Sequence, residues 1–177
     1  MNKKINLVLC SDLRMLDFDL HNLIIDNNCI RYDRRDAFKK LDYQVLDPIL
    51  KEINEKERAY EIIKVKSEKL LSDIYLILNE FHNVNYEMRQ WKIILGHWLF
   101  RFTSVLYNRF YTIEKCLIKY EISNVTIFKG DDYHLSTNDS NSFIWATDND
   151  IWNNILYSKT LNFFKNKISK KNISINS

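Results

Sequence analysis

The sequence predicts an α/β fold that is rich in helix, with a small parallel sheet and long amphipathic helices. Short apolar runs rich in strand-forming residues, at 5–10 and 125–128, are typical of strands buried on both faces. Between them, apolar residues recur at helical spacing from Leu70 to Phe81 and again from Met88 to Leu117. The order strand, helices, strand, helix is that of layered α/β proteins.

Composition narrows the classes of function. The chain has 177 residues with only two Gly and one Pro, which excludes Gly-rich phosphate loops. Cys10, Cys29 and Cys116 lie far apart, so we expect neither a disulfide framework nor a metal site, and we expect a cytoplasmic protein. The dispersed net charge of +3 predicts no nucleic-acid partner. No apolar stretch approaches about 20 residues, so no transmembrane segment is expected.

The first 50 residues give mixed patterns. After the strand at 5–10, leucine and isoleucine recur at helical spacing over residues 13–24. Asn27-Asn28 indicates a turn, and residues 29–32 are compatible with a second short strand. Asp47-Pro48 predicts a helix start, because Asp is a good N-cap and Pro is favoured at the first helical position.

Two long helical segments follow. Residues 51–69 are highly charged and predict one or two solvated helices, which continue into the amphipathic stretch 70–81. Residues 82–85 indicate a break. The next helix, over 88–117, is the longest, roughly 45 Å at 1.5 Å per residue.

The last third predicts a strand at 125–128, a polar loop over 131–142 and a final helix. Thr147-x-x-Asp150 resembles a capping box, and apolar residues then continue at helical spacing to Ile168. The polar segment from Lys165 onward is expected to fray. We therefore predict one domain over residues 1–168 and a polar tail over residues 169–177.

One region resembles a known family. It contains Asn79-x-x-His82, then Arg89-x-Trp91 continuing to Gly96-His97-Trp98-Leu99, then Asn108-Arg109. This resembles a family of transferases encoded in bacterial O-antigen and capsule gene clusters, which carry Asn-x-x-His, Arg-Tyr-Trp-x-x-x-x-Gly-Pro-Trp-Leu and Asp-Arg. Asp148-x-Asp150-x-Trp152-Asn153 is similar to a helix start in that family. The resemblance covers residues 42–160, and Gln90, His97 and Asn108 depart from the pattern.

The resemblance implies the N-terminal part of a two-domain fold like that of glycosyltransferases. Such enzymes bind the donor nucleotide mainly on the C-terminal half, and family members are several times longer than this chain. The implied partners are a nucleotide-sugar donor, a saccharide acceptor and a second transferase half, with no covalently bound cofactor. The implied activity is transfer of a sugar from the activated donor during surface-polysaccharide assembly.

Four residues in and near this region are candidates for substrate binding. Trp91 and Trp98 either pack between helices or offer rings on which a sugar stacks. Arg89 and Arg109 either lie on a solvated helix edge or bind a phosphate or carboxylate, which suits the planar guanidinium fork.

The candidate catalytic residues are His82 and Asp132. His82 is either a general base or a helix-terminal side chain that caps carbonyl groups. Asp132 and its neighbour Asp131 follow the strand 125–128, and ligands of open parallel sheets bind beyond the carboxyl ends of strands. There Asp131 would bind substrate and Asp132 act as acid or base; the alternative is an ordinary acidic surface loop.

A different class of function remains open. The long aromatic stripe would also suit a helical interaction module without an active site, or a truncated, inactive fragment that docks onto a partner chain.

Overall fold

The computed structural model describes residues 4–164 and 167–175, and the chain divides into two compact units. The first unit comprises residues 1–49 and 109–177, and the second comprises residues 50–108. Helix α3 (Met88–Lys119) contributes residues to both units. The prediction of one domain over residues 1–168 stays a prediction.

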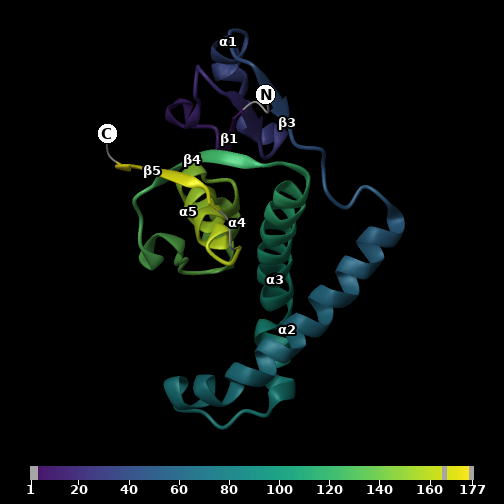
Figure 1. Cartoon of the computed structure of the whole chain (residues 1–177). Coiled ribbons are helices and arrows are strands. Elements are labelled where there is room, and N and C mark those ends of the chain that lie inside the picture. Colours follow the sequence, from purple (N-terminus) through teal and green to yellow (C-terminus); the bar gives the residue numbers. More distant parts are fainter. Residues whose placement is uncertain (1–3, 165–166, 176–177) are drawn as a thin grey trace. The chain divides into compact units, whose positions relative to one another are not determined.

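A five-stranded, wholly parallel sheet forms the first unit, and it confirms the predicted fold class (Figure 1). The spatial order is β3-β2-β1-β4-β5. The strands are β1 (Ile5–Val8), β2 (His21–Ile24), β3 (Tyr43–Val45), β4 (Ile122–Phe128) and β5 (Ser169–Ile173). The strand order reverses direction beside β1, where β2 lies on one side and β4 on the other. This is the arrangement of doubly wound nucleotide-binding sheets.

Two buried asparagines fix the connection between β1 and β2. Asn6 donates one hydrogen bond to the Asn22 side chain (2.8 Å) and another to the Met15 carbonyl (2.9 Å). Asn22 in turn donates to the Asp17 carbonyl at 2.7 Å. Buried amides need such partners. Residues 12–20 are therefore held against the sheet without a long helix.

The structure corrects the predictions for residues 11–50. Residues 13–24, whose apolar spacing is helical, do not form one helix. They form the 3-10 helix η1 (Leu13–Met15) and strand β2, in which Leu23 and Ile24 are buried in the sheet. Residues 29–32 are not a strand: Cys29 ends the 3-10 helix η2 (Asn27–Cys29), and Tyr32 begins η3 (Tyr32–Arg34). The short helix α1 (Arg35–Phe38) follows.

Helix α5 (Asp150–Leu161) packs against β4. Its fully buried Asn154 accepts a hydrogen bond from the Phe128 backbone N–H (2.8 Å) and donates to the Thr126 carbonyl (3.2 Å). The segment expected to be a loop contains the 3-10 helix η4 (Asp132–Leu135) and helix α4 (Ser140–Thr147). Asn149, not Thr147, caps α5, and its side chain accepts from the Trp152 N–H.

The expectation of a frayed tail is wrong for residues 169–173. These residues form β5, which pairs along its length with β4. Four of its five side chains are exposed, as is usual for a polar edge strand. Residues 165, 166, 176 and 177 lie outside the described part of the chain.

The second unit is a helical hairpin of α2 (Ile53–His82) and the first part of α3, as the periodicity predicts. Leu71, Trp91 and Leu99 form its buried cluster. The break falls at Asn83, whose φ of 51° is left-handed; asparagine tolerates this conformation at a helix end. Helix α2 begins at Ile53 rather than at Asp47-Pro48, because Leu50 has a left-handed φ of 55°, which a right-handed helix cannot include.

Among the residues that the structure describes, no helix has the length and apolar character needed to cross a membrane.

Candidate functional site

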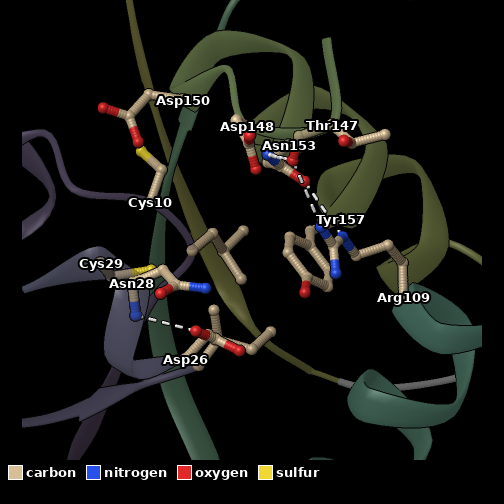
Figure 2. Close-up of a pocket in the computed structure, with 12 residues that line it drawn as sticks. Cys10, Asp26, Asn28, Cys29, Arg109, Thr147, Asp148, Asp150, Asn153 and Tyr157 are labelled. Atoms are coloured by element: carbon tan, nitrogen blue, oxygen red, sulfur yellow. Dashed lines mark hydrogen bonds between the residues drawn. The ribbon is translucent and has the colours of Figure 1, made fainter. Parts of the chain in front are cut away.

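A cleft of about 100 Å³ lies at the carboxyl ends of β1 and β2, on the edge of the sheet where ligands of this architecture bind (Figure 2). It receives residues from both strand ends, from α3 and from the α4–α5 junction. The lining residues are Leu9, Cys10, Ile25, Asp26, Asn28, Cys29, Arg109, Thr147, Asp148, Asp150, Asn153 and Tyr157.

Arg109 is the cation of this cleft, and its guanidinium is held from several directions. Nε donates to the Asn153 amide oxygen at 3.0 Å, and Nη2 donates to the Thr147 carbonyl at 3.4 Å. Its Cζ atom lies 5.5 Å from the centre of the Tyr157 ring, in a cation–π contact. Figure 2 shows the guanidinium directed toward Asn153 and Thr147. A permanent charge is therefore fixed in place before any ligand arrives.

Asn153 fixes the position of Arg109 in turn. Its amide nitrogen donates to the carbonyls of Thr147 (2.7 Å) and Asn149 (3.0 Å), so the amide oxygen faces Arg109. The turn between α4 and α5 and the guanidinium thus form one hydrogen-bonded group.

The other buried titratable groups of the cleft are uncharged. Burial raises the pKa of the Cys29 thiol to about 12 and raises the pKa values of Cys10 and Tyr157 further. A thiol of this kind is a poor nucleophile at neutral pH. The charges facing the cleft come from Arg109 and from aspartates, of which Asp26 and Asp148 are exposed.

Asp150 joins the end of β1 to the start of α5. Its carboxylate accepts from the Ser11 backbone N–H (2.9 Å) and from the Ser11 hydroxyl (2.6 Å). Arg34 lies 3.9 Å from the same carboxylate and donates to the Ser11 carbonyl. Asp150 therefore has a positioning role in the cleft wall.

Asp131 and Asp132 lie where the sequence predicts, just beyond the carboxyl end of β4. The Asp131 carboxylate lies 2.8 Å from Nδ1 of His134, and this hydrogen bond lowers the pKa of Asp131. The Asp132 side chain is 90% exposed and pairs with Lys159. Neither aspartate lines the Arg109 cleft. Their roles stay predictions.

The remaining predicted residues lie in the helical hairpin. Trp91 is 5% exposed, and its indole N–H donates to Asn79 Oδ1 at 2.7 Å. Trp98 stacks on Phe102 with ring centres 5.1 Å apart. His82 is the last residue of α2, and its ring centre lies 5.6 Å from that of Trp91. Arg89 is exposed in the first turn of α3.

These contacts give both tryptophans a packing role, and the binding and catalytic roles predicted in the hairpin stay predictions. Of the predicted site residues, the structure places Arg109 in the cleft. Sequence reasoning missed Tyr157, and it noted Asp150 and Asn153 only as part of a helix start. No group of three metal-ligating side chains occurs among the described residues.

Comparison with protein families gives a match to the LIC12162 family transferase model over residues 5–177. No curated protein and no solved structure matches the chain. The match extends through both compact units, from the first strand to beyond the last. The chain therefore belongs to the LIC12162 family of transferases.

Proposed function

We propose that this chain takes part in transfer of a sugar from a nucleotide-sugar donor during surface-polysaccharide assembly, with the Arg109 cleft as a substrate-binding site. The observation that supports this best is the fixed guanidinium at the carboxyl edge of a doubly wound parallel sheet. Membership of a transferase family supports group transfer as the class of reaction.

The charges of the cleft suit a group that carries both an anion and hydroxyls. The permanent positive charge of Arg109 suits a phosphate or a carboxylate. Asp26 and Asp148 offer carboxylate oxygens that accept hydrogen bonds from sugar hydroxyls. Because the volume is only about 100 Å³, the cleft accommodates one such group rather than a whole nucleotide-sugar. The phosphate of the donor and the carboxylate of an acidic sugar share this chemistry.

Calorimetry on the full chain tests the proposal and separates the two sources. One titration uses UDP-glucose and the other uses glucuronate, each with wild-type protein and with Arg109→Gln. We expect Arg109→Gln to weaken binding of the cognate probe about tenfold or more, as loss of a charge-assisted hydrogen bond does. Arg35→Gln removes an exposed arginine that does not line the cleft and serves as the control. The proposal is contradicted if neither probe binds the wild-type protein. It is also contradicted if Arg109→Gln binds the probe with the same affinity as the wild type.

A second function, docking of a partner chain, is supported by the helical hairpin. Leu76, Ile77 and Phe81 on α2 are 63%, 63% and 81% exposed, and Ile93 and Ile94 on α3 are 77% and 55% exposed. Exposed apolar side chains are typical of interaction surfaces when they are contiguous. Analytical ultracentrifugation tests this function: a chain that stays monomeric at high concentration, and binds no apolar-surface dye, contradicts it.

A further inference from the structure

A second cavity, of about 480 Å³, lies between η4, α4 and the start of α5 in the same unit as the sheet. Its size falls in the range of small-molecule sites. The residues that line it are Tyr133, His134, Ser136, Thr137, Asn138, Ser142, Trp145, Ala146, Asn149, Ile151 and Trp152.

Three aromatic rings border this cavity, and two of them are open to solvent. Tyr133 is 82% exposed and Trp145 is 70% exposed, whereas Trp152 is buried and donates its indole N–H to the Leu135 carbonyl at 3.2 Å. Within the described part of the chain, the Trp145 indole N–H and the Tyr133 hydroxyl make no hydrogen bond. Flat apolar faces with a polar group at the edge suit a ring that is apolar on its face and polar at its rim. A pyranose sugar has this form.

Polar side chains complete the lining. Thr137 and Asn138 supply a hydroxyl and an amide, each able to donate and accept hydrogen bonds. Among the described residues that line the cavity, none is Asp, Glu, Lys or Arg. The chemistry therefore favours a neutral, hydroxyl-rich ligand over an anion.

His134 also lines this cavity, and Asp131 orients it. Nδ1 of His134 lies 2.8 Å from Asp131 Oδ1, and the Asp131 backbone N–H also donates toward Nδ1 at 3.3 Å. The contact with the carboxylate, which only accepts, needs a proton on Nδ1, whereas the contact with the backbone N–H needs a lone pair there; the shorter, charge-assisted contact favours the proton on Nδ1. Nε2 then holds a lone pair. An imidazole oriented by a carboxylate in this way is the usual arrangement of a general base.

The α4–α5 junction is shared by the two cavities. Thr147, Asp148 and Asn153 face the Arg109 cleft, whereas Ala146, Asn149 and Trp152 line the aromatic cavity. The two cavities therefore border the same short segment of chain, residues 146–153.

We propose that the aromatic cavity binds the saccharide acceptor and that His134, oriented by Asp131, is the general base for the acceptor hydroxyl. This inference rests on the proposed glycosyl transfer. In the step, Nε2 of His134 takes the hydroxyl proton while that oxygen forms a bond to the anomeric carbon of the nucleotide-sugar. The bond from that carbon to the phosphate oxygen breaks, and the nucleoside diphosphate leaves with the electron pair. The proton then passes from His134 to solvent.

The tautomer of His134 gives the first test. Nitrogen-15 shifts of the imidazole in the full chain should show the Nδ1–H form. Asp131→Ala should abolish that preference, and Asp131→Asn, which retains an accepting oxygen, should restore it. Asp132→Ala is the matched control, since Asp132 pairs with Lys159 instead. A dominant Nε2–H form in the wild type overturns the assignment of the base.

Saccharide binding gives the second test. Methyl glycosides of glucose, galactose and N-acetylglucosamine are titrated while the Trp145 indole and the His134 ring are followed by NMR. We expect saturable shifts at both groups with at least one glycoside, and at least tenfold weaker binding by Trp145→Ala. Phe18→Ala, which removes an equally exposed aromatic outside this cavity, should bind normally. Glycerol at the same concentration should cause no saturable shift.

The outcomes separate this inference from the function on which it rests. If no glycoside gives saturable shifts, or Trp145→Ala binds as the wild type does, the acceptor site is wrong. If glycosides bind without changing the His134 ring, the base assignment is wrong. Arg109→Gln should not alter glycoside binding. If the chain binds glycosides but neither UDP-glucose nor glucuronate, the proposed function of the Arg109 cleft is wrong. The acceptor site then still stands.

Discussion

Asp150 shows how a single side chain holds the cleft wall together. It is 31% exposed at the side chain, and it accepts two hydrogen bonds from Ser11, which is itself buried. We expect Asp150→Ala to lower the free energy of unfolding by about 1–3 kcal/mol, because the Ser11 N–H and hydroxyl lose their acceptor. Asp148→Ala, at an exposed neighbouring carboxylate, should change it by less than about 0.5 kcal/mol. Urea unfolding measures both, and equal midpoints would refute the role of Asp150.

The buried thiols predict how stability depends on pH. Burial raises the pKa of Cys29 and Cys116 from the ordinary 9.0 to about 12. Between these values the unfolded chain loses thiol protons that the folded chain retains. The unfolded state then binds fewer protons, so the free energy of unfolding falls as the pH rises above 9. Chemical unfolding at a series of pH values should show this decline.

Cys116→Val supplies the control for that prediction. Cys116 is fully buried, and valine fills similar space without a titrating group. Between pH 9 and pH 12, the free energy of unfolding of the variant should fall less steeply with pH than that of the wild type. The difference in slope should correspond to about one proton. A slope identical to that of the wild type would mean that the Cys116 thiol titrates alike in both states.

At the scale of elements, Asn79 closes the hairpin between α2 and α3. Its amide oxygen accepts from the Tyr86 N–H (3.1 Å) and the Trp91 indole (2.7 Å), and its amide nitrogen donates to the Tyr86 carbonyl (2.9 Å). Asn79, Tyr86 and Trp91 thus form one hydrogen-bonded group, here called the hairpin clasp, which joins the end of α2 to the start of α3. This contact gives Asn79 and Trp91 a structural role in the hairpin.

Asn79→Ala should therefore loosen the hairpin. We expect a loss of about 2–3 kcal/mol in the free energy of unfolding, since three hydrogen bonds disappear and the buried indole N–H is left without its acceptor. Trp91 emission should shift to the red and exchange of the amides around residues 83–91 should accelerate. Asn79→Asp keeps the acceptor and should give an intermediate loss. Glu80→Ala, on the exposed neighbour, is the control; a comparable effect there would contradict the hairpin clasp.

The sequence predicts an element well where a long run of residues follows either helical spacing or strand alternation and clearly excludes the other pattern. Helix α3 follows its apolar positions closely, and β1 and β4 appear as β-branched or apolar runs. Strand β2 has four residues, and its apolar residues fit helical spacing equally well; its pairing with β1, which buries Leu23 and Ile24, is long-range and absent from the local pattern. The sequence predicts a polar tail in place of strand β5, because an edge strand needs few apolar side chains.

The same reasoning limits what could be predicted of the cleft. The resemblance points to Arg109, but its partners Asn153 and Thr147 lie 44 and 38 residues away in the chain. Asp150 contacts Ser11 across 139 residues. Such pairs are produced by the strand order, which local patterns do not contain. His134 and Asp131, three residues apart, form a local pair, and of the two the position of Asp131 after strand β4 is what the sequence pattern indicates.

At the scale of the whole molecule, the division into two units predicts that the sheet unit folds without the hairpin. Residues 1–49 and 109–177 contain all five strands, α5 and the Arg109 cleft. The two cut ends are close enough to join: Asp47 pairs with Lys119, and Arg109 lies ten residues earlier on α3, about 15 Å along the axis. A flexible linker of about ten Gly and Ser residues spans that distance.

We expect the chain in which such a linker replaces residues 50–108 to retain a cooperative urea transition and a dispersed NMR spectrum. Its m-value should be smaller than that of the full chain, in proportion to the surface that unfolding exposes. Adding Leu7→Asp, which puts a charge into a fully buried position of β1, should abolish the transition and supplies the unfolded reference. A shortened chain that resembles this reference would show that the sheet requires the hairpin. The two units would then be one folding domain, as the sequence predicts for residues 1–168.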